Sequence, residues 1–204
     1  LDLFRAPKSD ETRRLIAATT AAPRRVPPPP ADAPLLMEAE EVVRAYPLPR
    51  KRLFERRRKT RVLDEVTLTI RAGESVGLVG ESGSGKSTLA RTVLALDRPN
   101  AGTIRFRGAN LFALSPPALR GVRPEIQAVF QDPYASFDPR HTVGRIVGEP
   151  LHLLGGACGA DERRHRVIEA LRHVGLGEAD AARYPHQFSG GQRQRIAIAR
   201  AIVT

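Results

Sequence analysis

The chain contains little of several residue types that define common protein classes. It has a single cysteine, Cys158, so no disulfide framework is possible and a reducing compartment is favoured. It has no tryptophan and few other aromatic residues. It also lacks a signal-peptide pattern and an apolar run of about 18 residues, the length at which a helix can span a bilayer. The sequence therefore predicts neither a disulfide-rich scaffold nor a membrane-spanning helix.

The positive charge is large but local. The 204 residues, enough for one domain with a buried core, carry a formal net charge of +11. The segment from Arg50 to Arg61 holds eight basic residues and one acid, and so contributes +7 of this charge. A solvated loop, a contact with anionic lipid headgroups and a nucleic-acid contact are all possible interpretations. Phe54 is the only aromatic residue in the segment, which favours the solvated loop, and we expect no specific nucleic acid partner.

A glycine-rich string predicts a phosphate-binding loop. Residues Gly80–Ser87 read GESGSGKS and fit the pattern G-x-x-x-x-G-K-[ST]. An apolar run at 76–79, predicted to be a strand, precedes the string, and helical spacing from Ser87 to Leu96 follows it. This order places backbone N–H groups and a helix N-terminus around an anion, which argues against a chance glycine-rich turn. The predicted nucleotide contacts are Gly80, Glu81, Ser82, Gly83, Ser84, Gly85, Lys86, Ser87 and Thr88.

A second string indicates which nucleotide-binding family this is. Residues 188–203, FSGGQRQRIAIARAIV, resemble the signature motif of ABC-type ATPases. Residues 129–133 resemble the Q-loop of that family, and Tyr46 lies where the family places an aromatic ring against adenine. All four elements occur in the order of the family, over residues 36–204. Two segments narrow the resemblance to the ATPase subunits of dipeptide, oligopeptide and nickel importers: 131–140, which reads QDPYASFDPR, and 183–202.

The resemblance and the residue patterns together predict an α/β fold. We expect a P-loop NTPase of ABC type, with a strand-rich subdomain, a RecA-like core and a helical insertion at about 132–190, truncated at its C-terminal end. Alternating apolar residues predict strands at 66–70 and 102–107, and a further strand is expected at 126–130. Helical spacing runs through 142–184 and ends one helix at Gly175. Ser189 is placed to cap the last helix, whose predicted apolar side is Ile196, Ile198, Ala199 and Ile202.

The first 35 residues do not fit this domain. A helix is predicted at 3–18, and its sequence resembles the C-terminal end of the ATPase domains of peptide importers. Residues 27–30 are four consecutive prolines within a stiff spacer. We therefore expect the tail of a preceding ATPase domain at 1–22, a proline-rich linker at 23–35 and a second, incomplete ATPase domain at 36–204. The alternative is a single domain with an N-terminal extension.

The resemblance also implies a chemistry, with ATP and Mg²⁺ as cofactors. Lys86 is expected to reach the β and γ phosphates, and Ser87 and Gln131 to approach Mg²⁺. Two such domains would face each other head to tail, so that Ser189, Gly190, Gly191 and Gln192 serve the nucleotide of the partner domain. Lys86 and Gln131 are the catalytic candidates. Tyr46 offers a π-face to adenine, although ordinary packing of a tyrosine at a strand end is the alternative.

The water-polarising carboxylate of the family is not found after the signature. In the family that the chain resembles, this carboxylate is the glutamate of an Asp-Glu pair at the end of an apolar strand, and a switch histidine follows the pair. Neither the pair nor the histidine occurs between Ser189 and Thr204. Asp64-Glu65 is also an Asp-Glu pair after apolar residues, but it precedes the phosphate loop, where the family has a surface strand. We therefore reject it as the catalytic pair. The histidines lack metal-ligand spacing, so no metal other than Mg²⁺ is expected. The 204 residues alone are therefore expected to be inactive and poorly soluble.

The resemblance implies an ATP-hydrolysing motor for an importer of peptides or similar small solutes. We expect it to lie on the cytoplasmic face of the inner membrane and to contact transmembrane permease subunits through 131–147. Two alternatives stay open: a soluble ABC ATPase of DNA repair or translation, and a regulatory ABC domain that does not hydrolyse ATP.

Overall fold

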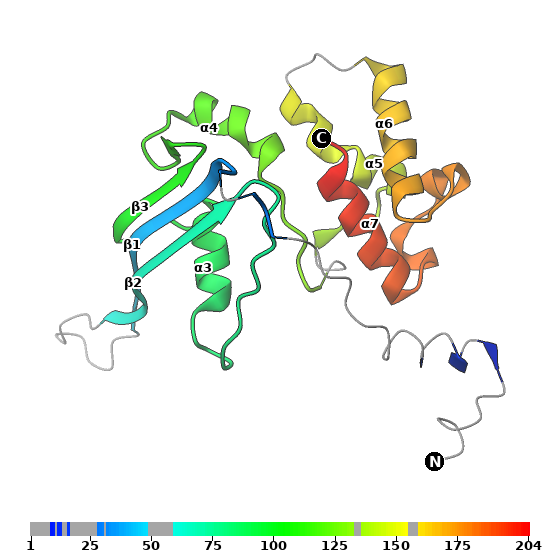
Figure 1. Cartoon of the computed structure of the whole chain (residues 1–204). Coiled ribbons are helices and arrows are strands. Elements are labelled where there is room, and N and C mark those ends of the chain that lie inside the picture. Colours follow the sequence, from blue (N-terminus) through cyan, green and yellow to red (C-terminus); the bar gives the residue numbers. More distant parts are fainter. Residues whose placement is uncertain are drawn as a thin grey trace, which may run out of the picture.

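The computed structural model describes residues 9–10, 12–13, 16, 28–30, 32–48, 59–132, 136–154 and 159–204. Figure 1 shows a strand-rich part with α3 and α4, and a group formed by α5, α6 and α7. The strands are β1 (Leu35–Pro47), β2 (Lys59–Arg71), β3 (Ala101–Phe106) and β4 (Ala109–Asn110). The α-helices are α3 (Lys86–Val93), α4 (Pro116–Val122), α5 (Val143–Val147), α6 (Ala160–His173) and α7 (Gly190–Ile202). The 3₁₀ helices are η1 (Arg123–Glu125), η3 (Glu149–Leu154), η4 (Glu178–Ala182) and η5 (Pro185–Gln187).

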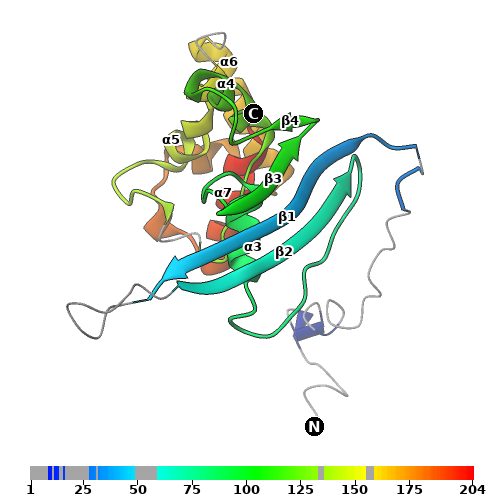
Figure 2. The same cartoon turned by 90° about the vertical axis from the view of Figure 1, so that its left-hand side faces the viewer.

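The described strands form one antiparallel sheet in the order β2-β1-β3-β4, and β1 and β2 are its long strands (Figure 2). Alternation along each strand sends one set of side chains to the core, because successive residues point to opposite faces. Met37 and Ala39 of β1 lie opposite Phe106 and Ile104 of β3, and all four are buried. Leu89 of α3 joins the same hydrophobic cluster. The sheet therefore holds α3, the helix that follows the phosphate loop, against its apolar face.

The predicted strands at 66–70 and 102–107 are confirmed by β2 and β3, except that Arg107 lies in the turn after β3. The other two predicted strands are wrong. Residues 76–79 and 127–130 have no regular secondary structure, and Val79 and Phe130 are 93% and 48% exposed. A strand needs a neighbour that pairs with its backbone groups, and no described strand pairs with either segment. Apolar composition alone therefore did not produce a strand at these two places.

The helical group has a hydrophobic core of its own. Val143, Ile146 and Val147 of α5 are buried against Leu171 of α6 and Ile196 of α7. Gly175 follows α6 with a φ of 74° and ends it in the left-handed conformation that glycine favours. The predicted helical region at 142–184 thus contains α5, η3, α6 and η4.

The predicted apolar side of the last helix is partly wrong. Ile196 and Ala199 are fully buried, but Ile198 and Ile202 are 37% and 51% exposed. The buried face also includes Ala197, and Val203 continues it just after the helix. The face that packs in α7 is set by α5, α6 and η3, its neighbours in the structure, and not by apolar composition alone.

Hydrogen bonds join the strand-rich part to the helical group. Arg123 of η1 donates from its two terminal nitrogens to the carbonyls of Leu94 and Ala95, at 2.7 and 2.9 Å, and so binds the C-terminal end of α3. Thr204 donates from Oγ1 to the carbonyl of Pro124 at 3.0 Å. Within the part of the chain that the structure describes, no helix is both long and apolar enough to cross a membrane.

Several predictions concern residues that the structure does not describe. Most of the helix predicted at 3–18 lies outside the described residues, as do 23–27 and 31 of the linker, 50–58 of the basic segment, 133–135 and Cys158. Of the N-terminal residues that are described, Asp10, Thr12, Arg13 and Ile16 are helical. The division of the chain into a tail, a linker and a second domain stays a prediction.

Candidate nucleotide site

The phosphate loop is closed by its own lysine. Lys86 is the first residue of α3, and its Nζ donates to the carbonyls of Gly80 at 2.8 Å and Glu81 at 2.5 Å. Nζ also lies 3.4 Å from Oγ of Ser84. The ammonium is therefore held over the loop, at the N-terminal end of a helix, where a phosphate group would meet both the positive charge and the helix dipole.

The phosphate loop joins α3 through a glycine with a left-handed backbone. Gly85, the N-cap of α3, has a φ of 96°, and a Cβ at this position would lie 2.7 Å from the carbonyl oxygen of Val62 and 3.2 Å from Cδ2 of Leu63. Only glycine combines this left-handed backbone with such a close approach to β2. Ser87 is exposed in the first turn of α3, where its hydroxyl is available to a cation beside the phosphates. The residues present thus fit a nucleoside triphosphate with Mg²⁺.

Tyr46, the predicted adenine contact, is a half-buried residue near the end of β1. The guanidinium carbon of Arg44 lies 4.6 Å from the centroid of the Tyr46 ring, in a cation–π arrangement. The Tyr46 hydroxyl donates to Oδ2 of Asp97 at 3.2 Å. One face of the ring is therefore covered by a cation, and the ring is held at its hydroxyl end.

The segment 97–100, which we call the 97–100 turn, is bonded closely to β1. Asn100 accepts a hydrogen bond from the backbone N–H of Ala45 at 2.7 Å through Oδ1, and its own N–H donates to the carbonyl of Val43 at 2.8 Å. Arg44 donates from Nη1 to the carbonyl of Arg98 at 2.7 Å. The turn therefore fixes the end of β1 that carries Tyr46.

Gln131, predicted to approach Mg²⁺, lies on an exposed bend. Further along the chain, Arg200 of α7 donates to the carbonyl and to Oγ of Ser136, at 3.0 and 3.1 Å. The hydrogen bonds that Asp138 accepts from the side chain and the backbone of Arg140 hold the pKa of the Asp138 carboxyl well below its usual range. The segment that follows the Q-loop is thus tied to the last helix.

The signature residues lie at the exposed start of α7. Ser189 is the N-cap, as predicted: its Oγ accepts from the N–H of Gln192 at 3.4 Å, and Oε1 of Gln192 accepts from the N–H of Ser189 at 2.9 Å. Gly190 and Gly191 are exposed, and a Cβ added to either would meet no atom within 4 Å. Phe188 is 3% exposed and anchors the segment in the helical core. The exposed helix start could therefore meet an anion that is bound to another molecule.

The phosphate loop and the signature belong to different hydrophobic clusters. Leu89 of α3 packs with the sheet, whereas Ile196 of α7 packs with α5 and α6. Figure 1 shows α3 beside the strands and α7 in the helical group. The structure thus brings the residues of each motif together, but it holds the two motifs on separate cores.

Asp64 and Glu65, the rejected alternative for the catalytic pair, are exposed residues of β2. Asp64 accepts a hydrogen bond from Nη1 of Arg61 at 2.7 Å, which is an ordinary surface ion pair. Among the residues that the structure describes, no group of three or more His, Cys, Asp or Glu side chains could hold a metal ion.

Sequence reasoning missed three residues around Tyr46, namely Arg44, Asp97 and Arg91. Asp97 follows Tyr46 by 51 positions and belongs to no motif. An aspartate just after the helix of a phosphate loop is a weak signal, because acidic residues are common in turns. The alternation along β1 could not identify Arg44 either, because the sequence does not show that an arginine near the end of a strand will be half-buried.

The fold and the phosphate loop define a P-loop nucleotide-binding protein. The chain belongs to the ABC transporter family, since the model of that family, described as "ABC transporter", matches residues 63–204. The peptidoglycan transport ATP-binding protein YejF of Agrobacterium fabrum is 43% identical over 203 residues, which are 98% of this chain and 36% of YejF. The di/tripeptide transport ATP-binding protein DppF of Pseudomonas aeruginosa is 42% identical over 168 residues, 82% of this chain and 51% of DppF. The chain thus spans about half of the length of DppF and about a third of that of YejF.

The fold agrees with solved ABC cassettes. A dimeric, post-hydrolysis structure of the ATP-binding cassette MJ0796 bound to ADP and Pi superposes with a TM-score of 0.68 and 33% identity. The match covers 82% of this chain and 69% of the MJ0796 chain. The predicted fold class, an α/β P-loop NTPase of ABC type, is confirmed, and so is the resemblance to the ATP-binding proteins of peptide transport systems.

Proposed function

We propose that the chain is the ATP-binding and ATP-hydrolysing part of an importer for peptides or similar small solutes. The observation that carries this proposal is the closed phosphate loop, in which the Lys86 ammonium lies over the carbonyls of Gly80 and Glu81 at the start of α3. The printed names of YejF and DppF, both transport ATP-binding proteins, support the transport role.

Each residue of the site has a role in this proposal. Lys86 exchanges its carbonyl partners for the β and γ phosphates, and Ser87 and Gln131 hold Mg²⁺. Magnesium, when it is bound, neutralises negative charge on the phosphate oxygens. Tyr46 stacks on adenine with the ring face that Arg44 does not cover. Lys86 and Gln131 are the residues of this chain that act at the reacting phosphate.

A second ABC ATPase domain completes the site. Ser189, Gly190, Gly191 and Gln192 cap the nucleotide of that partner, which is part of the same polypeptide if the two domains are fused. The separate cores of the two motifs and the dimeric state of MJ0796 support this head-to-tail arrangement. The alignment with YejF covers 98% of the chain and so includes most of residues 1–35, which supports a fused pair.

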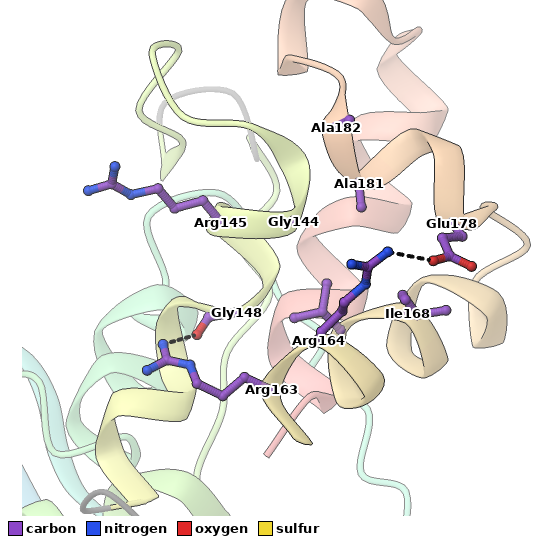
Figure 3. A pocket seen from close by; sticks show the side chains of 10 residues that line it. Gly144, Arg145, Gly148, Arg163, Arg164, Ile168, Glu178, Ala181 and Ala182 are labelled. Carbon is purple, nitrogen blue, oxygen red and sulfur yellow. Dashed lines mark hydrogen bonds and ion pairs between the residues drawn. The ribbon is translucent and has the colours of Figure 1, made fainter. Parts of the chain in front are cut away.

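A transmembrane permease subunit docks on the helical group, on the cytoplasmic face of the inner membrane. A hollow of about 480 Å³ lies between α5, α6 and η4. Val167, Ile168, Ala181 and Ala182 give it apolar walls, and Arg145, Arg163, Arg164 and Glu178 supply charge. In Figure 3, Arg164 reaches toward Glu178, with which it pairs at 3.1 Å, while Arg145 extends away from the alanines. The hollow suits a short amphipathic helix, because it offers an apolar groove and cationic groups.

The docking proposal is tested by filling the hollow. Ala182→Trp is expected to leave ATP affinity unchanged and to abolish the stimulation of hydrolysis by the reconstituted permease. Ala113→Trp, at an exposed turn outside the hollow, serves as the matched control and should keep the stimulation. Normal stimulation of the Ala182→Trp variant would remove the hollow as the docking site.

We also propose that the 204 residues by themselves do not turn over ATP. No Asp-Glu pair follows the signature in this sequence, so a water-polarising carboxylate is not present where the family has one. The exposure of Val76 at 44%, Leu78 at 50% and Val79 at 93% supports poor solubility of this piece. A measured turnover above background would assign the catalytic base to an acid within these residues.

The nucleotide site itself is tested with Lys86→Ala in the full-length protein. ATP affinity should fall at least about tenfold, because a charge-assisted contact between an ammonium and a phosphate contributes on the order of 1.5–3 kcal/mol. Lys59→Ala removes an exposed lysine of β2 and is the matched control. Equal affinities of the two variants in equilibrium titration would refute the assignment of the phosphate loop.

A further inference from the structure

The Tyr46 ring and the phosphate loop are joined through one aspartate. Oδ2 of Asp97 accepts the Tyr46 hydroxyl at 3.2 Å and Nε of Arg91 at 3.0 Å. Arg91 belongs to α3, the helix that Lys86 opens. The Asp97 side chain is 19% exposed, whereas that of Arg91 is 58% exposed, so the carboxylate is the better-shielded member of the pair.

The backbone makes the same connection. The N–H groups of Leu96 and Asp97 both donate to the carbonyl of Arg91, at 2.9 and 3.3 Å, so the turn continues directly from the end of α3. At its other end the 97–100 turn is bonded to β1 through Asn100 and Arg98. Tyr46 is therefore not a free side chain at a strand end, because β1 and α3 both fix its position through this turn.

Covering one ring face makes the position of the ring important. The Arg44 guanidinium lies 4.6 Å from the ring centroid, and Nε of Arg44 is buried without a hydrogen-bond partner among the described residues. A base can stack only on the opposite face. A rotation of the ring about its χ angles would turn that face away, and the hydrogen bond to Asp97 opposes such a rotation.

We propose that Asp97 is a positioning residue that holds the Tyr46 ring in the stacking orientation and ties the adenine half of the site to α3 and the phosphate loop. This inference rests on the proposed function, in which Tyr46 contacts adenine. It assigns to Asp97 no contact with the nucleotide. Replacing Asp97 should therefore weaken only ligands that carry a base, because only these contact the Tyr46 ring.

The test compares two ligands, ATP and inorganic tripolyphosphate, each with Mg²⁺, on the full-length protein. Asp97→Ala is expected to weaken ATP about 3- to 10-fold, the range of one net hydrogen bond, and to leave tripolyphosphate within about twofold. Tyr46→Phe keeps the ring, removes the hydroxyl and should give the same result. The double variant should lose no more than either single variant, because both remove one interaction.

Two further variants serve as controls. Asp97→Asn keeps an acceptor for the hydroxyl and should stay within about twofold of the parent for ATP. Glu162→Ala removes an exposed acid that pairs with Arg166 at 2.7 Å on α6, and should change neither affinity. Circular dichroism identifies any variant that fails to fold, and in that case Tyr46→Phe still supplies the ratio of the two affinities.

Each remaining outcome has a definite meaning. If Asp97→Ala leaves ATP affinity unchanged, or weakens ATP and tripolyphosphate equally, Asp97 does not position the ring. Equal losses for Asp97→Ala and Asp97→Asn would place the effect in the charge beside Arg91 and would also overturn the proposal. Unchanged ATP affinity of Tyr46→Ala would instead refute the adenine contact in the proposed function, and the inference with it.

Discussion

Gly85→Ala tests whether the phosphate loop binds ATP in the conformation that the structure gives it. Gly85 has a φ of 96°, and an added Cβ would lie 2.7 Å from the Val62 carbonyl oxygen. Gly83 has a similar φ of 84°, but a Cβ there would meet no atom within 4 Å. The two glycines thus separate the cost of a left-handed backbone from the cost of a collision with β2.

The expected magnitudes follow from these two terms. A left-handed alanine costs about 1–2 kcal/mol, so Gly83→Ala should weaken ATP about 10-fold. The collision at position 85 adds roughly 1–3 kcal/mol, as other overpacked sites do. Gly85→Ala should therefore weaken ATP about 100-fold or more, because the free loop relaxes away from β2 and ATP binding must then restore the strained conformation.

The assay is equilibrium titration with ATP and Mg²⁺, together with denaturant unfolding of both variants. Gly85→Ala should show the larger loss in both measurements, because the collision involves the backbone of β2 as well as the loop. Equal ATP affinities of Gly83→Ala and Gly85→Ala would show that the contact between Gly85 and Val62 is absent from the binding-competent loop.

Two further predictions concern the helical part. Ile196→Ala should lower the free energy of unfolding by about 2–5 kcal/mol, since Ile196 is fully buried. Ile202, on the same helix, is 51% exposed, so Ile202→Ala should lower it much less. Urea unfolding of the two variants measures the difference. Asp138→Asn should flatten the dependence of stability on pH. The pKa of Asp138 is lowered by Arg140, so its stabilising contribution is present above the pKa of an unfolded aspartate, about 3.9, and is lost as pH falls below it. Parallel stability curves of parent and Asp138→Asn between about pH 2 and pH 6 would contradict this.

Local signals in the sequence predicted much of this structure. The glycine pattern located the loop around Lys86, the alternation at 66–70 located β2, and Ser189 marked the start of α7. Each of these features depends on residues that are close in sequence: a turn, a strand face or a helix cap.

The failures concern features that depend on distant neighbours. Val79 and Phe130 lie in apolar runs that form no strand, because no described strand pairs with them. Ile198 is apolar but exposed, because the neighbours of α7 lie on the other side of the helix. The link from Tyr46 to Asp97 spans 51 positions and has no motif, so only the structure could reveal it.

Ser189→Arg in the full-length protein tests the central claim most directly, namely that the phosphate loop of this chain binds ATP while its signature serves the nucleotide of a partner domain. The added side chain would lie at the exposed start of α7, away from the hydrophobic cluster that holds α3. The measurement is ATP affinity at the Lys86 site, paired with the rate of hydrolysis at the opposite composite site. We predict an affinity within about twofold of the parent and a loss of hydrolysis of at least tenfold, because a bulky cation replaces the serine that caps the partner's phosphate. Loss of ATP binding at the Lys86 site itself would contradict the account.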